Sequence, residues 1–407
     1  MTVNELRDQF PALSAQVYGK PLVYFDNAAT SERPLSVMEK WLEMNRLHNA
    51  NIHRAVHKTA VDATDAFELS RERVQRFLGA ASREEIVFTS GATASVNLVA
   101  SSFCGCQLSE GDRILVCEAE HHSNLVPWQL EAARCGAGVE PFPVLDSGEI
   151  DLDGLRAKLD SRVKLVAVAH ISNVLGIVNP VAEIVRLCHA AGIPVLVDGA
   201  QGVVHEKIDV QALDCDFYVF SGHKMYAATG TGVLYGKKAW LDRLPPYMGG
   251  GEMIGSVRFT GTTFAPLPQK FEAGTQNISA VPTLVPAIET LEAMREEPVA
   301  LAYRDTGRYL YDALRSDPRI RLFGIPRRDE DKIPLFSFAV EGVHHEDLAL
   351  ILDKLGIAVR SGQMCAEPLM DRFGVTGMLR ASLAPYNTRE EAEYFIRSLD
   401  TAIQMLR

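Results

Sequence analysis

Residues 195–201 read Val-Leu-Val-Asp-Gly-Ala-Gln, and residues 216–224 read Asp-Phe-Tyr-Val-Phe-Ser-Gly-His-Lys. Each segment is an apolar run that ends in polar groups, which is typical of a strand covered on both faces of a parallel sheet. Ligands of open α/β sheets bind at the carboxyl ends of the strands. The two segments therefore predict strands that bring Asp198 and Lys224 to a ligand-binding edge.

Strand-like and helix-like segments alternate through the first two thirds of the chain. Further short apolar runs lie at 114–116, 164–169 and 232–235, and helix-like segments include 127–135 and 181–191. This alternation predicts an α/β layer with a mostly parallel sheet. Glycine and proline are frequent between residues 245 and 268, where we expect a long mobile loop.

The pattern changes after residue 295. A helix-like stretch at 281–294 is followed by strand-like segments at 333–340, 357–360 and 379–383 and by helix-like segments at 346–355 and 389–406. Thr388 and Glu391 form a capping-box pattern at the start of the last helix. Residues 295–407 are therefore expected to form a smaller α+β domain.

The composition narrows the class of protein. The 407 residues include 41 basic and 52 acidic side chains, and the net charge of −11 disfavours nucleic acid and anionic membranes as partners. Seven scattered cysteines form no disulfide framework and favour a reducing compartment. We find no secretory signal and no run of about 18 apolar residues, and we expect a soluble, cytoplasmic protein without a membrane partner.

Asp198 and Lys224 are the first candidates for chemistry. Burial of a lysine at a strand end lowers the pKa of its amine and makes it nucleophilic. Pyridoxal phosphate needs these two groups, an amine for a Schiff base and a carboxylate that keeps the pyridine nitrogen protonated. Asp198 alone could equally cap a helix, and most lysines are exposed, so the pair is more specific than either residue.

A phosphate site is indicated by residues 86–93, Ile-Val-Phe-Thr-Ser-Gly-Ala-Thr, which read as a strand, a turn and the start of a helix. Backbone N–H groups at that helix start, with the Thr93 hydroxyl, can bind a dianion. The alternative is that Thr93 only caps a core helix. Neither of the common phosphate-binding glycine motifs is present.

Three further residues could act on a ligand. His121 follows a strand, and because no Cys or His spacing completes a metal site, it is either a helix cap or an imidazole stacked on a cofactor. Arg380 lies in an apolar strand and needs either a substrate carboxylate or a buried ion pair. Cys365 lies in a loop close to Arg360, where a thiolate is favoured, whereas most of the other cysteines are expected in the core.

Taken together, these segments resemble the cysteine desulfurases of the class V aminotransferase family, within pyridoxal-phosphate fold type I. The matching blocks, in family order, are 24–30 (YFDNAAT), His53-Arg54, 120–122 (EHH), 172–176 (SNVLG), 197–201 (VDGAQ), 221–224 (SGHK), 272–275 (EAGT) and 380–388 (RASLAPYNT). The loop Arg360-x-Gly-x-x-Cys365-Ala-x-Pro is similar to that of the group II, Suf-type enzymes. The chain departs from the usual family pattern at Ala94, Ala227, Ala228, Gln276 and Met364.

The resemblance implies a role for each matching residue. Lys224 holds the cofactor and moves the substrate's α-proton, Asp198 pairs with the pyridine nitrogen, and Cys365 accepts the substrate's sulfur as a persulfide. Gln201 bonds the cofactor's phenolic oxygen, and His121 stacks on its ring. The implied cofactor-binding set is Ala92, Thr93, His121, Asn173, Asp198, Gln201, Ser221, His223, Lys224 and, from the other subunit of a homodimer, Thr275; Asn173, Arg360 and Arg380 hold the substrate carboxylate.

The resemblance also implies an architecture and a function. The architecture is a large domain with a mostly parallel seven-stranded sheet over 21–294, a small domain with the cysteine loop over 295–407, and an N-terminal segment, 1–20, that packs with the small domain. The function is release of alanine from L-cysteine, with sulfur passed to a SufE-like or SufU-like acceptor for iron–sulfur cluster assembly. The alternatives are a selenocysteine lyase, a cysteine sulfinate desulfinase, an aminotransferase or epimerase, and a non-catalytic sulfur-carrier scaffold.

Overall fold

The computed structural model describes residues 1–407, and its largest feature is a seven-stranded sheet with the order β4-β10-β9-β8-β7-β5-β6. The strands are β4 (Ile86–Thr89), β5 (Arg113–Cys117), β6 (Gly138–Phe142), β7 (Val163–Ala169), β8 (Val195–Asp198), β9 (Phe217–Ser221) and β10 (Gly232–Gly236). Only β10 runs antiparallel to its neighbours, so the expected mostly parallel sheet is confirmed. β8 and β9 are adjacent and parallel, and their carboxyl ends lie at one edge.

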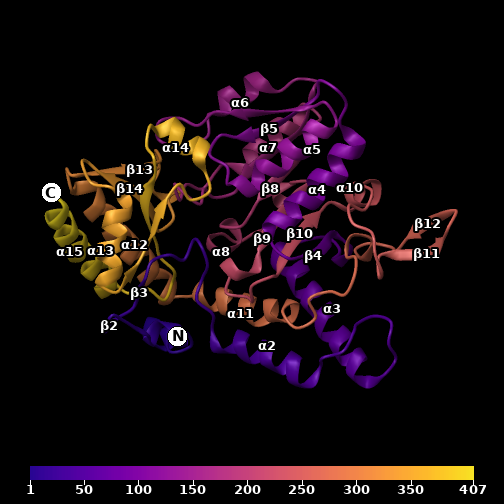
Figure 1. The fold of residues 1–407 in the computed structure, drawn as a ribbon, viewed down its shortest axis with the longest axis horizontal. Coiled ribbons are helices and arrows are strands. Elements are labelled where there is room, and N and C mark those ends of the chain that lie inside the picture. The colour runs from indigo at the N-terminus through magenta and orange to yellow at the C-terminus, as the bar shows by residue number, and fades with distance from the viewer.

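Helices cover both faces of this sheet, which explains why its strands are apolar throughout (Figure 1). One core cluster joins the strands to α4 (Ala92–Gln107), α5 (Val126–Arg134) and α10 (Lys238–Arg243). Another joins them to α3 (Lys58–Leu78), α7 (Val181–Ala190) and α11 (Leu284–Met294). Within β8, Leu196 belongs to the first cluster while Val195 and Val197 belong to the second. Further helices complete this part: α2 (Leu35–Leu47), α6 (Leu152–Lys158), α8 (Gly202–His205) and α9 (Val210–Leu213).

A second, antiparallel sheet has the order β13-β14-β17-β16. Its strands are β13 (Ile320–Phe323), β14 (Leu335–Val340), β16 (Arg360–Gly362) and β17 (Met378–Ser382). A separate core cluster packs it against α12 (Val299–Ser316), α13 (His345–Lys354) and α15 (Arg389–Leu406). The capping box predicted at Thr388 and Glu391 is present at the start of α15. The short helix α14 (Glu367–Phe373) lies between β16 and β17 in the chain.

The segment 245–268 differs from the expected loop. It contains an antiparallel hairpin of β11 (Ile254–Arg258) and β12 (Gly261–Phe264), which projects from the body of the molecule (Figure 1). The frequent glycines predict a segment without regular structure, but Gly261, with a φ of +156°, lies next to the turn of the hairpin. The side chain of Phe259 beside this turn is fully exposed.

Several predicted boundaries shift by a few residues. The strand expected at 333–340 begins at Leu335, and the helix expected at 281–294 starts as a 3₁₀ turn, Val281–Thr283. The strand expected at 357–360 is two strands, because β15 (Ile357–Ala358) pairs with β3 (Val23–Tyr24) whereas β16 pairs with β17. This break turns the chain toward Cys365.

The N-terminal segment contacts both sheet layers. It contains α1 (Val3–Arg7), a 3₁₀ turn at Pro11–Ser14 and the small strands β1 (Gln16–Val17) and β2 (Lys20–Pro21). The buried Phe10 ring lies 4.8 Å from the ring of Tyr386 and 6.0 Å from that of Tyr226, centroid to centroid. Arg7 forms an ion pair with Glu391 at 2.8 Å. No helix combines the length and the apolar character that crossing a bilayer requires.

Candidate active site

The carboxyl ends of β8 and β9 open into a cavity of about 340 Å³. Its lining includes twelve residues singled out from the sequence: Ala92, Thr93, His121, Asn173, Asp198, Gln201, Ser221, His223, Lys224, Arg360, Cys365 and Arg380. Arg360 and Arg380 come from β16 and β17, whereas Asp198 and Ser221 come from the large sheet. The cavity is therefore built by both sheets.

Asp198 is buried at the end of β8, as expected from the sequence. One carboxylate oxygen, Oδ1, accepts a hydrogen bond from the backbone N–H of Ala200 at 2.9 Å. The other oxygen accepts no hydrogen bond from the chain. Burial raises the pKa of Asp198, although the Ala200 bond and the charge of Lys224 oppose the shift. The free oxygen is available to a protonated ring nitrogen.

Lys224 follows β9 and lines the cavity without a hydrogen bond or an ion pair in the chain. Burial lowers the pKa of its amine; Asp198 opposes this shift, and the positive charge of Arg380 adds to it. A lysine of this kind is more readily deprotonated than a surface lysine, and its neutral amine can bind a carbonyl carbon or accept a proton.

His121 lies in the lining as a neutral imidazole. Its Nδ1 accepts a hydrogen bond from the backbone N–H of Ser123 at 3.0 Å, which leaves the ring proton on Nε2. Burial, with the charge of Lys224, lowers its pKa to about 4. His121 is thus both a cap of a 3₁₀ turn and a cavity residue, and its stacking on a cofactor stays a prediction.

The start of α4 lines the cavity at the position where the sequence predicts a phosphate site. The helix begins after Gly91 without a side-chain cap, so N–H groups of its first turn lack helical partners. The Ser221 hydroxyl oxygen accepts a hydrogen bond from the Ala92 backbone N–H at 2.8 Å, and its own proton remains free to donate. Thr93 donates to Ser123 at 2.9 Å. A Cβ on Gly232 would come within 2.3 Å of the Gly91 backbone, so the turn needs glycine there.

Two arginines occupy the opposite end, and both contact Asp26, a residue with no role assigned from the sequence. Arg360 approaches Asp26 at 2.6 Å and Arg380 approaches it at 3.2 Å. Arg380 also donates to the Asn173 carbonyl at 2.8 Å, while its buried Nε has no partner. The buried ion pair considered for Arg380 is therefore present, and three of the five guanidinium N–H groups, that of Nε included, have no partner in the chain.

Cys365 is exposed and lines the cavity, in a loop that hydrogen bonds from two other segments of the chain hold in place. Its carbonyl accepts a hydrogen bond from the His122 backbone N–H at 2.7 Å, and the carbonyl of Met364 accepts one from the Asn173 side chain at 2.9 Å. Met364 and Cys365 have φ angles of +50° and +56°, which non-glycine residues rarely adopt. Tertiary contacts therefore hold the thiol in a strained turn.

Two other residues near the cavity were missed from the sequence. The His122 side chain accepts a hydrogen bond from the Glu367 backbone N–H at 3.2 Å, so it caps α14 at the end of the cysteine loop. Glu120 is buried, and burial together with the charge of Asp198 raises its pKa to about 8 despite a hydrogen bond from Asn124. The adjacency Glu120-His-His122 was visible, but only the fold shows what each side chain contacts.

The groups left unpaired around the cavity fit pyridoxal phosphate. They are the Lys224 amine, one Asp198 oxygen, the N–H groups at the start of α4 and the unpaired N–H groups of Arg380. In order, these match an aldehyde, a ring nitrogen, a phosphate and the carboxylate of an amino-acid substrate. Gln201 already donates to the Ala28 carbonyl at 2.8 Å, which leaves its other amide groups for a ligand.

Thr275 is the one predicted site residue outside this cavity. Its side chain is exposed, and it is absent from the lining. It follows Glu272, which is buried, and Gly274, which has a φ of +80°. Thr275 therefore does not reach the cavity of its own chain.

Comparison with known proteins places these features in context. The family model described as Aminotransferase class-V matches residues 23–395. A probable cysteine desulfurase of Vibrio cholerae is 45% identical over 406 residues, covering 100% of both chains. One from Synechocystis is 46% identical over 400 residues, covering 98% of this chain and 95% of the relative.

Solved structures agree with the sequence comparison. The cysteine desulfurase CsdA of Escherichia coli superposes with a TM-score of 0.91 at 40% identity, over 100% of both chains. A cysteine desulfurase of Thermococcus onnurineus superposes with a TM-score of 0.92 at 35% identity, over 99% of this chain and 98% of the other.

Proposed function

The chain belongs to the aminotransferase class-V family, and from this premise we propose that it is a pyridoxal-phosphate-dependent cysteine desulfurase. It takes the sulfur of L-cysteine onto Cys365 and releases L-alanine. The observation that carries the proposal is the position of Cys365, an exposed thiol that lines the same cavity as Lys224 and Asp198. An aminotransferase or epimerase on this fold needs no thiol there.

Pyridoxal phosphate would be held at Lys224, with Asp198 at its ring nitrogen and with Ala92, Thr93, Ser221 and His223 at its phosphate. When bound, the cofactor withdraws electrons from the amino acid, so that Cα loses its proton and Cβ releases sulfur. His121 and Gln201 complete the lining around the ring.

The arginines orient the substrate through its carboxylate. Asp26 neutralises part of their charge, so an incoming carboxylate competes with Asp26 for both guanidinium groups. Asn173 supports the Arg380 guanidinium through its carbonyl. This placement directs the substrate's Cβ and sulfur toward the cysteine loop.

Lys224 and Cys365 carry out the proton and sulfur transfers. The Lys224 amine, whose pKa burial lowers, accepts the Cα proton of the substrate. The Cys365 thiolate attacks the substrate's sulfur. The S–S bond forms as the bond between Cβ and the sulfur breaks, and Cβ takes up a proton. The products are alanine and a persulfide on Cys365, whose exposure leaves it open to an acceptor thiol.

The proposal extends to the assembly and to the pathway. We propose a homodimer of the Suf-type, group II kind, which works in the cytoplasm. It passes sulfur to a SufE-like or SufU-like acceptor for iron–sulfur cluster assembly. Seven free cysteines are consistent with a reducing compartment. Thr275 lies outside its own cavity, and α2 exposes the apolar side chains of Leu35, Met38, Trp41 and Leu42. These two features support a second copy that covers α2 and receives Thr275.

Replacing the nucleophile tests the function. Cys365→Ala should lower persulfide formation from L-cysteine by more than about a thousandfold, because no other thiol lines the cavity. Cys106→Ala, which removes another exposed thiol, is the matched control and should keep full activity. Mass spectrometry after turnover should find one added sulfur on the peptide of Cys365.

Two outcomes would contradict the proposal in different ways. Persulfide or sulfide release from L-cysteine by Cys365→Ala would favour a selenocysteine lyase or a sulfinate desulfinase, whose leaving groups need no thiol. Failure of borohydride to trap pyridoxal phosphate on Lys224 would favour a non-catalytic sulfur-carrier scaffold.

A further inference from the structure

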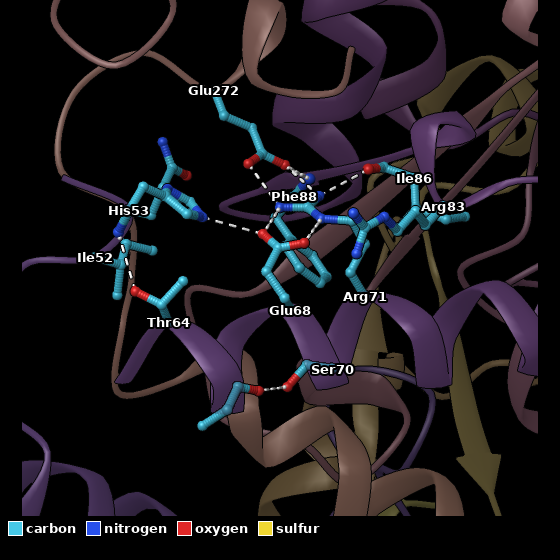
Figure 2. Close-up of polar contacts among 12 residues, drawn as sticks. Ile52, His53, Thr64, Glu68, Ser70, Arg71, Arg83, Ile86, Phe88 and Glu272 are labelled. Atoms are coloured by element: carbon cyan, nitrogen blue, oxygen red, sulfur yellow. Dashed lines mark hydrogen bonds and ion pairs between the residues drawn. The ribbon is translucent and has the colours of Figure 1, made fainter. Parts of the chain in front are cut away.

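A buried charge cluster lies outside the cavity, between α3 and the segment that carries Thr275 (Figure 2). Its centre is Arg71, whose side chain is fully buried. The guanidinium donates to Glu272 at 2.7 and 2.9 Å, to Glu68 at 3.1 and 3.2 Å, and to the Ile86 carbonyl at 2.8 Å. These five bonds use all five N–H donors of the arginine, so its orientation is fully determined.

The cluster is tied to the large sheet on one side. Glu272 Oε1 also accepts a hydrogen bond from the Phe88 backbone N–H in β4 at 2.7 Å. β4 is held by its ladder with β10, and the turn that follows it is held by the bond from Ala92 to Ser221. The sheet is therefore the rigid support, and the hydrogen bond of Glu272 to β4 attaches the segment that carries Thr275 to the sheet.

On the other side the cluster holds a surface loop. His53 bonds Glu68 at 3.1 Å, as Figure 2 shows, and its neighbour Arg54 forms an ion pair with Glu252 at 3.1 Å. His53 and Glu252 have φ angles of +71° and +66°, a conformation that side chains other than glycine adopt only where contacts impose it. Burial raises the pKa of Glu68, but the bond from His53 and the charge of Arg71 outweigh it and lower the pKa to about 2, so the carboxylate stays ionised.

The polar contacts close into a ring around the segment of Thr275. The Gly251 carbonyl, next to Glu252, accepts a hydrogen bond from the Gly274 backbone N–H at 3.0 Å. Gly274 lies between Glu272, fixed to Arg71, and Thr275, which is exposed. Two anchors thus define the backbone immediately before Thr275, although its own hydroxyl has no partner in the chain.

Resting on the dimer of the proposed function, we propose that Arg71, Glu68 and Glu272 are positioning residues that present Thr275 to the cofactor phosphate of a second copy. Loss of the Glu272 carboxylate then weakens cofactor binding in the partner subunit and spares the subunit that carries the change. β4 keeps its sheet ladder without Glu272, whereas the Thr275 segment loses its principal anchor.

Mixed dimers test this assignment, because Lys224→Ala leaves only one protomer able to trap the cofactor covalently. In dimer one, one chain carries both Glu272→Gln and Lys224→Ala, and the other chain is unchanged. In dimer two, one chain carries Glu272→Gln and the other chain carries Lys224→Ala. Retention of pyridoxal phosphate on the single Lys224 is measured by borohydride trapping and peptide mass spectrometry during dilution. Dimer one should retain the cofactor about tenfold less well than dimer two, the scale of one lost charge-assisted hydrogen bond.

Glu292→Gln, which removes a surface carboxylate paired with Arg73, is the control and should leave both dimers alike. If Glu272→Gln does not fold, Glu68→Gln at the less buried edge of the cluster replaces it in the same pairings. Equal retention in the two dimers, or a loss in dimer two alone, overturns the positioning role. A monomer in sedimentation overturns the dimer itself, which is a failure of the proposed function and is distinguished by that measurement.

Discussion

At the scale of one residue, Asp26 balances the charge of the two arginines at the proposed carboxylate site. It lies between Arg360 and Arg380 and shares its charge with both. Arg380 is only 3% exposed, and a buried guanidinium without a counter-charge is costly. Asp26 therefore stabilises the buried arginine, and under the proposed function it competes with the substrate carboxylate.

Asp26→Asn should have two opposite effects. The free energy of unfolding should fall by about 3 kcal/mol, because a buried charge loses its partner. The affinity for a carboxylate-bearing competitive inhibitor should rise, because its competitor for the arginines is gone. Urea denaturation and inhibitor titration measure the two quantities.

Asp317→Asn, which breaks a partly exposed pair with Arg319, is the control and should change stability by less than about 1 kcal/mol. Unchanged stability together with weaker inhibitor binding in Asp26→Asn would show that Asp26 orients the arginines and does not compete with the substrate.

His170 is a second residue whose environment decides its behaviour. It is 7% exposed, its Nδ1 lies 2.9 Å from the Tyr218 hydroxyl, and burial lowers its pKa to about 4. An unfolded histidine titrates near 6.5, so below that pH the unfolded chain binds a proton that the folded chain refuses.

His170→Gln should therefore flatten part of the pH dependence of stability. Above about pH 6.5 the two proteins should differ by a constant amount. Between about pH 6.5 and 4 the unsubstituted protein should lose up to about 1.4 kcal/mol per pH unit that the variant keeps, and the difference should level off below pH 4. If the urea midpoints of the unsubstituted protein and of His170→Gln keep a constant difference across this pH window, His170 is protonated in the folded protein.

At the scale of elements, the cysteine loop depends on α14 and its cap. His122 accepts a bond from Glu367 at the helix start, and its backbone holds the Cys365 carbonyl. The loop is short, and its two left-handed residues are held by these external contacts. The position of the thiol is thus a property of the helix and of its cap as much as of the cysteine.

His122→Ala should lower the rate of persulfide formation about tenfold and weaken stability by about 1 kcal/mol, the value of a helix cap. His344→Ala is a matched control, because His344 caps α13 in the same way at 3.3 Å and lies outside the cavity lining. It should lose similar stability and no activity. Equal losses of activity in both variants would reduce the role of His122 to stability alone.

At the scale of the whole molecule, two sheets build one cavity; most of the second sheet packs in its own core cluster, whereas Phe323 and Met378 belong to a cluster of the large sheet. We propose that the division expected from the sequence, 21–294 and 295–407 with 1–20 attached, describes two units, with β3 as an exception because it pairs with β15. Phe10 packs between Tyr226 of one unit and Tyr386 of the other. The N-terminal segment thus contacts residues of both units.

The exposed apolar face of α2 gives a prediction for the assembly. Trp41→Glu should shift the sedimentation of the protein from dimer toward monomer, because a charge in an apolar interface is desolvated without a partner. Leu350→Glu changes a similarly exposed residue on α13 and should leave the dimer intact. A dimer unchanged by Trp41→Glu would place the interface elsewhere.

The apolar pattern of the strands predicts the α/β layer, and the polar residues at the strand ends indicate where a ligand binds. Continuous apolar strands that end at Asp198 and Ser221 predict a parallel sheet with its ligands at one edge. The reason is that a strand buried on both faces carries an unbroken apolar run, which can be recognised in a short stretch of sequence. Residue types at those ends, read with the family resemblance, were enough to single out twelve residues that line one cavity.

Which charged side chains pair, and which remain without a partner, follows from the folded arrangement and not from local sequence. Asp26 and Arg380 are 354 residues apart in sequence, and Arg71 and Glu272 are 201 apart. No periodicity reports such contacts, because they depend on how separate elements pack. The same holds for the hairpin at β11 and β12 and for the turn that holds Cys365, where strand pairing and distant hydrogen bonds override what glycine and local propensity suggest.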